Sequence, residues 1–374
     1  MKQANDIIAF FSLLKAGLWE QAGVNLNLNL NYKIDWGKVY QLAEEQSVIG
    51  VVLAGIEHSS LKPPQELLLQ WIGEVQMLEQ QNKMMNKFIA ELIEKMRKAD
   101  IYTLLVKGQG IAQCYERPLW RASGDVDFYL SDTNYAKAKA FFRPLVDAFD
   151  PDTEHAQHIN MHYGDWVVEI HANQYCLLSS RINKVIDEIH KNLFYEGRVR
   201  SWNNCDTTVF LPSPDNDVLI IFTHFLKHFY KGGLGVRQIC DWCRLLWTYK
   251  DSLNLGLLES RVRKMGLMNV WKGFAAFAVE YLGMPSDAMP FYSSEKKWKR
   301  KADRISSFIL EVGNFGHNRD SSYYSKYPRL IRKVFSFGRR CEDMLRHTKI
   351  FPLETFRFFP NMVYNGLIAV TRGE

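Results

Sequence analysis

The segment from Ile101 to Leu130 limits the possible folds of this 374-residue chain more than any other part of the sequence. It reads as a short apolar strand, a turn with two glycines, a helical stretch and a second strand. Because side chains alternate between the faces of a strand, Asp125 and Asp127 face the same way, about 6 to 7 Å apart. Val126 and Phe128 face the opposite way, toward a core. Two carboxylates at this spacing can hold Mg²⁺, although a solvated strand end would also carry such acids.

The turn upstream of the two aspartates has features that favour an anion. Leu104 to Val106 reads as a buried strand that leads into Lys107-Gly108-Gln109-Gly110, where glycine permits close approach of the backbone. Backbone N–H groups, the start of a helix expected from about 111 to 116 and the ammonium of Lys107 all suit a phosphate. An ordinary strand-to-helix connection is the alternative. Arg121 has two equally weighted interpretations, a phosphate contact or an ion pair with an acid.

A third acid is expected on a neighbouring strand. Strands are predicted from His158 to Tyr163 and from Trp166 to Ala172, joined by a tight turn at Gly164-Asp165. Glu169 and His171 share one face of the second strand, so Glu169 can join the aspartates in a three-carboxylate metal site. His171 is interpreted as a hydrogen-bonded or structural histidine rather than a ligand.

These residues together resemble the nucleotidyltransferase core of the DNA polymerase beta superfamily, and more closely the bacterial uncharacterised nucleotidyltransferase family. That family has a strand ending in Lys-Gly, an Arg shortly before Gly-Asp-hydrophobic-Asp, and a later Glu-hydrophobic-His. The matching elements here are Lys107-Gly108, Arg121, Gly124-Asp125-Val126-Asp127 and Glu169-Ile170-His171.

The likeness continues on both sides of this core. Before it, Asp35-Trp36 and the apolar stretch from Leu42 to Ile56 resemble the N-terminal helical region of the family. After it, His224 and the stretch from Arg237 to Asp241 also resemble parts of that family. The resemblance therefore covers most of residues 1 to 250.

The resemblance implies an α+β fold with a small mixed or antiparallel sheet, flanked by N-terminal and C-terminal helical regions. It implies Mg²⁺ or Mn²⁺ bound by Asp125, Asp127 and Glu169. It implies a nucleoside triphosphate held by Lys107, Gly108, Gln109, Arg121 and Gly124. Supporting or substrate contacts are expected from His171, His224, Arg237 and Asp241. The usual Gly-Ser turn of the superfamily is Gly-Gln here and lies somewhat farther from the first aspartate, which affects the phosphate contacts and leaves the carboxylates intact.

The hydrophobic pattern predicts three regions. Residues 1–99 are helical almost throughout, with a long helix over 65–98. Residues 100–211 hold the alternating strands and a helical stretch over 134–149, and residues 212–374 return to helix.

Composition favours a globular protein of the cytoplasm. Apolar residues make up 47% of the chain and charged residues 24%. No apolar run approaches the roughly 18 to 20 residues that cross a bilayer. The six cysteines lack the density of a secreted disulfide framework, so free thiols are expected.

The C-terminal region contains residues for a second candidate metal site. His224 and His228 are spaced i, i+4 on a predicted helix, and Cys240 and Cys243 follow. These are zinc-ligand types. The cysteines lie in an apolar helical stretch where buried thiols are ordinary, so the favoured prediction is a helical pair beside the core, with His224 or Arg237 reaching a substrate.

Charge is uneven along the chain. Residues 291–374 contain 17 Lys and Arg against 8 Asp and Glu, a balance of +9, so residues 1–290 sum to −3. Aromatic residues are interleaved with these basic residues at Trp298, Tyr323, Tyr324, Tyr327, Phe335 and Phe337. Such a region suits nucleic acid, an acidic protein or anionic lipid. A solvated face of helices with aromatics in the core is the favoured alternative.

Three functional hypotheses follow from the sequence. The first is an enzyme that transfers a nucleoside monophosphate from a nucleoside triphosphate to an unknown acceptor and releases pyrophosphate. The second is a nucleotide-binding regulator or partner-binding protein without turnover. The third is an RNA-binding or RNA-modifying protein that uses the basic C-terminal part. These motifs do not identify the base of the nucleotide or the acceptor.

Overall fold

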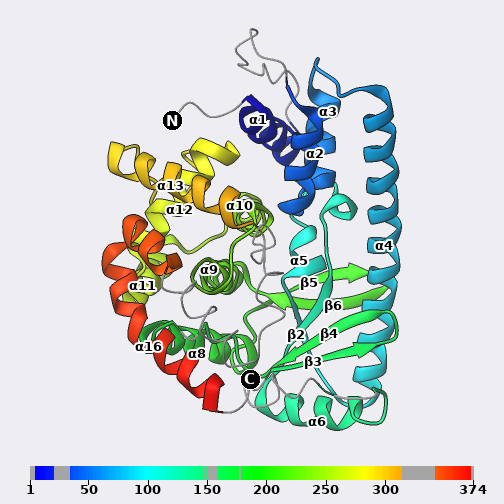
Figure 1. The fold of residues 1–374 in the computed structure, drawn as a ribbon. Coiled ribbons are helices and arrows are strands. Elements are labelled where there is room, and N and C mark those ends of the chain that lie inside the picture. The colour runs from blue at the N-terminus through cyan, green and yellow to red at the C-terminus, as the bar shows by residue number, and fades with distance from the viewer. Residues whose placement is uncertain are drawn as a thin grey trace.

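The fold is an α+β arrangement in which helices flank a small mixed sheet (Figure 1). The computed structural model describes residues 5–20, 34–146, 149, 158–176, 178–313 and 342–371. Within them, one sheet has four strands and a second has two. The expected fold class is therefore confirmed. The three-region division of the chain stays a prediction.

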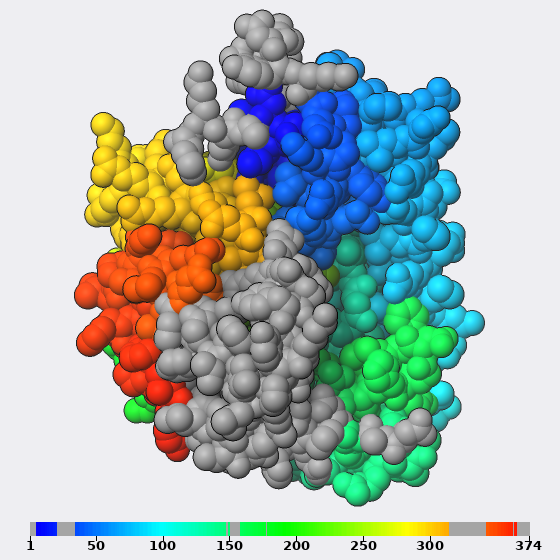
Figure 2. Space-filling view, viewed as in Figure 1, coloured from blue at the N-terminus to red at the C-terminus, as the bar shows by residue number. Residues whose placement is uncertain are grey.

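The described residues of the N-terminal part are mostly helical, as predicted. It comprises α1 (Asn5–Trp19), α2 (Trp36–Glu45), α3 (Ile49–His58) and α4 (Gln65–Lys98). Asp35 caps α2, because its side chain accepts a hydrogen bond from the backbone N–H of Lys38. The 34-residue α4 forms one edge of the molecule, and Figure 2 shows it on the side away from the yellow and orange C-terminal helices.

Helices α1 and α3 pack with their backbones in direct contact. A Cβ atom added to Gly17 would lie 1.8 Å from the carbonyl oxygen of Val51, and one added to Gly55 would lie 1.9 Å from that of Leu13. Glycine at these two positions is therefore what allows the close approach.

Helix α1 also reaches the C-terminal half of the chain, at α12 (Met268–Leu282). The ammonium of Lys15 donates to the carbonyl of Glu280 at 2.7 Å, and the indole N–H of Trp19 donates to that of Leu282 at 2.6 Å. Segments more than 260 residues apart in sequence thus meet at α1.

The four-stranded sheet has the order β1-β2-β4-β3. Its strands are β1 (Leu104–Val106), β2 (Asp125–Tyr129), β3 (His158–Tyr163) and β4 (Trp166–His171). The central pair β2 and β4 is parallel, whereas both outer pairs are antiparallel. The β3–β4 hairpin turns at Gly164-Asp165, where Gly164 has a left-handed φ of 61°. These strands lie where the sequence predicted them.

The two faces of this sheet differ as the alternation predicted. One face packs its apolar side chains, among them Val126, Phe128 and Ile170, against α4 and α6 (Asp132–Phe142). The acidic side chains of β2 and β4 point to the other face, where a pocket lies between the sheet and α9 (Pro214–Lys231). The sheet thus has one side for the core and one for the candidate site.

The structure corrects the predicted elements in three places. The helix after the glycine turn is α5 (Gly108–Ala112), which starts and ends earlier than expected. Helix α6 stops at Phe142 rather than near residue 149, because Pro144 lacks the N–H that a continued helix needs. A hairpin of β5 (Val199–Asn204) and β6 (Thr207–Pro212) was not predicted, and β6 lies against β1.

The C-terminal helices surround α9, which lies near the centre of the molecule in Figure 1. Most residues of α9 are buried. They are α8 (Ser180–Phe194), α10 (Val236–Thr248), α11 (Leu255–Met265), α12, α13 (Lys296–Val312) and α16 (Pro352–Thr371). Among the described residues, none of the helices is long and apolar enough to cross a membrane. Trp298 of α13 is buried, whereas the other interleaved aromatics of the basic region lie outside the described residues.

We expect Gly17→Ala to lower the free energy of unfolding by about 1 to 3 kcal/mol, because the added methyl group would overlap the backbone of α3. Gly73→Ala on α4 is the matched control, since its Cβ would meet nothing within 4 Å and alanine favours helix. Urea denaturation measures both. Equal effects of the two variants would contradict the tight α1–α3 contact.

Candidate metal and nucleotide site

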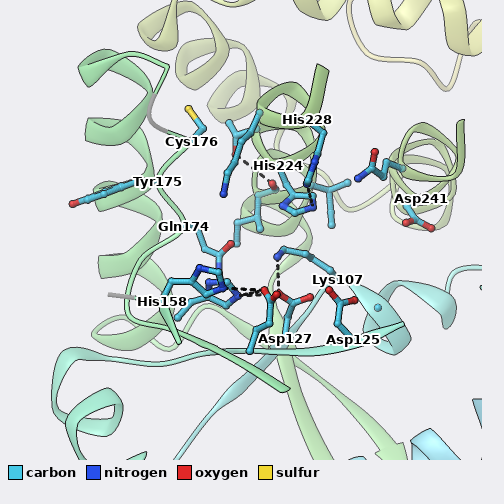
Figure 3. Close-up of a pocket in the computed structure, with 18 of the residues that line it drawn as sticks. Lys107, Asp125, Asp127, His158, Gln174, Tyr175, Cys176, His224, His228 and Asp241 are labelled. Atoms are coloured by element: carbon cyan, nitrogen blue, oxygen red, sulfur yellow. Dashed lines mark hydrogen bonds and ion pairs between the residues drawn. The ribbon is translucent and has the colours of Figure 1, made fainter. Parts of the chain in front are cut away.

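A pocket of about 590 Å³ lies between the acidic face of the sheet and helices α9 and α10. Figure 3 shows Asp125 and Asp127 on the sheet side, with His224 and His228 on the opposite side. The wall next to α9 is completed by the segment from Asn173 to Cys176, which follows β4. The pocket thus joins the predicted core to the helices that follow it.

Three carboxylates meet on the sheet side of the pocket. Parallel pairing of β2 and β4 places Asp127 directly beside Glu169, and Asp125 lies two residues along β2 on the same face. One oxygen of each carboxylate lies within 4.8 Å of one oxygen of the other two. The structure therefore brings together the three acids that the sequence singled out.

Asp127 is 2% exposed and is held by two neighbours. The ammonium of Lys107 lies 2.7 Å from its Oδ1, and Nε2 of His171 lies 2.9 Å from the same atom. Burial alone would raise the pKa of Asp127, but Lys107 and His171 outweigh burial and lower that pKa. Conversely, burial alone would lower the pKa of Lys107, and the neighbouring carboxylates raise it.

Glu169 is held by two histidines that approach from one side. Its Oε2 lies 3.1 Å from Nε2 of His158 and 3.3 Å from Nε2 of His171. The two imidazole rings stack with centroids 4.4 Å apart and planes 7° from parallel. Burial would raise the pKa of Glu169, but the hydrogen bonds from His158 and His171 hold it well below its ordinary value.

His158 was not among the predicted site residues, although the sequence held a signal for it. A hairpin that turns at Gly164-Asp165 places residue 158 opposite residue 171. The register of the hairpin is therefore sufficient to place His158 beside His171.

Asp125 is the most exposed residue of the three acids, although its carboxyl group lines the pocket and is partly shielded from solvent there. The negative charge of Asp127, followed by burial, raises the pKa of Asp125 to about 6. Two carboxylates this close repel each other when both are ionised. A divalent cation bound between them would remove this repulsion.

Arg121 forms a buried ion pair with Asp241 of α10, so the structure favours the ion-pair interpretation of this residue. Its Nε and one terminal nitrogen donate to the two oxygens of Asp241 at 3.0 and 2.6 Å. Tyr115 donates to the same carboxylate at 2.8 Å. The charge of Asp241 raises the pKa of Arg121, although burial opposes it. This bidentate pair connects the segment before β2 to the C-terminal helices.

The glycine turn contributes less to the pocket than expected. Lys107 takes a left-handed φ of 57°, and Gly108 lines the pocket. The side chain of Gln109 is buried away from the pocket, where its amide donates to Asn82 of α4 at 2.7 Å. Gly124 precedes β2 but does not line the pocket.

The zinc-type residues of α9 and α10 do not come together. Nε2 of His228 lies 3.2 Å from Nε2 of His224, and both histidines line the pocket. Cys240 and Cys243 are buried as free thiols in α10. Within the described residues, the groups suited to a metal are Asp125 with Asp127 and Glu169, and His158 with Glu169 and His171. Neither group contains a cysteine.

The fold and this site define an α+β protein with an acidic candidate metal centre in a pocket. The family model described as "Uncharacterised nucleotidyltransferase" matches residues 32–283, which is more than half of the chain. The chain therefore belongs to the uncharacterised nucleotidyltransferase family, and the resemblance found in its motifs is confirmed. Among curated proteins and among solved structures, none matches the chain at a significant level.

We expect Arg121→Met to lower the free energy of unfolding by about 3 to 5 kcal/mol, because it would leave the Asp241 carboxylate buried without its partner. Arg263→Met is the control, since Arg263 pairs with Glu259 on the exposed surface of α11 and such pairs contribute about 0 to 1 kcal/mol. Guanidinium denaturation gives both values. Similar losses in the two variants would contradict a structural role for the buried pair.

We expect Asp125→Asn to stabilise the metal-free protein at pH 8. Because the folded state holds the Asp125 proton more tightly than the unfolded chain, wild-type stability falls as pH rises from about 4 through about 6. The variant escapes this loss, so its advantage shrinks on acidification and vanishes below pH 4. The advantage is about 1 kcal/mol or less, since solvent screens an exposed group.

Thermal melting in EDTA between pH 4 and 8 measures this difference. Asp165→Asn at the β3–β4 turn serves as the control, because Asp165 is exposed and lies outside the pocket. A stability difference between wild type and Asp125→Asn that stays constant over this pH range would refute the assignment.

Proposed function

We propose that this protein is a metal-dependent nucleotidyltransferase. It transfers a nucleoside monophosphate from a nucleoside triphosphate to an acceptor and releases pyrophosphate. The observation that carries the proposal is the group of three carboxylates from neighbouring strands that faces a pocket, in a chain that belongs to a nucleotidyltransferase family.

Asp125, Asp127 and Glu169 would hold Mg²⁺ or Mn²⁺. All three offer hard carboxylate oxygens. The charge of Asp127 raises the pKa of Asp125, and a divalent cation bound between them would relieve this repulsion. The bound ion would polarise the α-phosphate and neutralise the charge that develops on the leaving pyrophosphate.

The remaining residues of the site keep these carboxylates ionised and oriented. Lys107 holds one oxygen of Asp127, and His158 and His171 hold one oxygen of Glu169. Because these contacts lower its pKa, Glu169 is a weak proton acceptor. The contacts of Glu169 therefore support a role as metal ligand over a role as general base.

In the proposed reaction, an atom of the acceptor forms a bond to the α-phosphorus of the nucleotide. The bond from that phosphorus to the oxygen of pyrophosphate breaks, and the electron pair stays on the pyrophosphate. Solvent or the pyrophosphate takes up the proton of the acceptor. The pocket of about 590 Å³ suits a ligand of nucleotide size.

Metal-dependent nucleotide binding is the expected result when ATP, CTP, GTP and UTP are titrated calorimetrically with Mg²⁺ or with EDTA. The double variant Asp125→Asn, Asp127→Asn should lose this metal dependence. With an acceptor found by screening, it should release pyrophosphate about 10²- to 10³-fold more slowly than wild type. Asp165→Asn should match wild type.

The outcomes of this experiment distinguish the enzyme from the non-catalytic regulator and test the proposed metal centre. Binding of a nucleotide without pyrophosphate release across the acceptor screen would support the non-catalytic regulator. Pyrophosphate release that survives in the double variant would exclude the proposed metal centre. The RNA-binding hypothesis depends on residues 291–374, of which 314–341 and 372–374 lie outside the described residues.

A further inference from the structure

The pocket has two electrically different walls. The sheet contributes the three carboxylates, and helices α9 and α10 contribute Lys227 and Arg237. Lys107 and Arg121 are the other lysine and arginine that line the pocket among the described residues. These four cations differ in whether a carboxylate of the protein forms an ion pair with them.

Two of the four cations are neutralised within the protein. Lys107 pairs with Asp127, and Arg121 pairs with both oxygens of Asp241. Lys227 has no hydrogen bond or ion pair among the described residues. Arg237 donates one terminal nitrogen to the carbonyl of Ala122, and its Nε is buried without a partner in the described part of the chain.

Both residues are half-buried. Such cations are costly, because a charge that is partly removed from water without an opposite charge loses hydration and gains little in return. Burial, and next the charge of Lys107, lower the pKa of Lys227. Burial, and next the charge of Arg121, lower the pKa of Arg237. The charges of Glu169 and Asp127 raise the pKa of Lys227, and those of Asp241 and Asp125 raise that of Arg237, but burial and the like charges outweigh them. An anionic ligand at this wall would balance the two cations.

We infer that Lys227 and Arg237 form an anion subsite for the terminal phosphates of the nucleoside triphosphate. This inference rests on the proposed function and names the part of the chain that holds the phosphates. The turn at Gly108-Gln109 supplies little for that task, because the Gln109 side chain points to α4 and the Lys107 ammonium is bound to Asp127.

Charge arithmetic supports this assignment. The three carboxylates carry −3, and Lys107 with one divalent ion supplies +3, which leaves nothing to balance a triphosphate. Lys227 and Arg237 add two positive charges on the wall that faces the carboxylates. A nucleotide whose α-phosphate lies at the carboxylates would extend its β- and γ-phosphates toward these two side chains.

The test uses inorganic tripolyphosphate, which carries the phosphates without a base, and measures its binding by calorimetry in EDTA and in Mg²⁺. Lys227→Met and Arg237→Gln should each weaken binding at least about tenfold under both conditions. Lys227→Arg should stay within about threefold of wild type. Lys231→Met, at the exposed end of the same helix and outside the pocket, should bind as wild type does.

Thermal melting distinguishes a binding role from a structural one. Without ligand, Lys227→Met should melt at the same temperature as wild type or higher, because it removes a half-buried cation that has no ion-pair partner among the described residues. Tripolyphosphate should raise the melting temperature of wild type and not that of Lys227→Met. A lysine with a merely structural role would instead lower the melting temperature of the ligand-free variant.

The double variant Asp125→Asn, Asp127→Asn separates this inference from the proposed function. It should keep tripolyphosphate binding in EDTA although its pyrophosphate release is slowed. The inference is overturned if wild type does not bind tripolyphosphate, or if Lys227→Met and Arg237→Gln bind it as tightly as wild type. It is also overturned if both variants keep wild-type affinity for nucleoside triphosphate, because the subsite would then serve an anionic acceptor.

Discussion

The ion pair between Lys107 and Asp127 is the contact on which the candidate site depends. Three carboxylates on one sheet face repel one another, and the most buried of them would be protonated without a cation beside it. Lys107 provides that cation from a backbone position with a left-handed φ, directly at the end of β1. Strand β2 can therefore keep an ionised aspartate in a nearly solvent-free position.

The rest of the site is fixed by pairings between elements that are distant in sequence. Parallel pairing of β2 and β4 sets Glu169 beside Asp127, and the β3–β4 hairpin sets His158 beside His171. The Arg121–Asp241 pair then connects the sheet to α10 across 120 residues. The acidic wall and the basic wall of the pocket consequently come from different regions of the chain and meet only in the folded protein.

The sequence predicted those parts of the structure that local periodicity controls. Alternation was enough to place Asp125 with Asp127 on one face of β2 and Glu169 with His171 on one face of β4, and the Gly164-Asp165 turn was enough to place a hairpin. The β5–β6 hairpin escaped prediction because its turn is formed by Cys205 and Asp206, which adopt left-handed φ values without a glycine. The partner of Arg121 and the direction of the Gln109 side chain depend on long-range packing, which one sequence without relatives does not contain.

The position of α1 has a consequence for how the chain is made. Its glycine-mediated contact with α3 involves neighbouring segments of the sequence, whereas its hydrogen bonds to α12 involve Glu280 and Leu282. During synthesis, which proceeds from the N-terminus, Lys15 and Trp19 exist long before these partner carbonyls do. Helix α1 can therefore pack on α3 early, but it completes its contacts only after α12 has been synthesised.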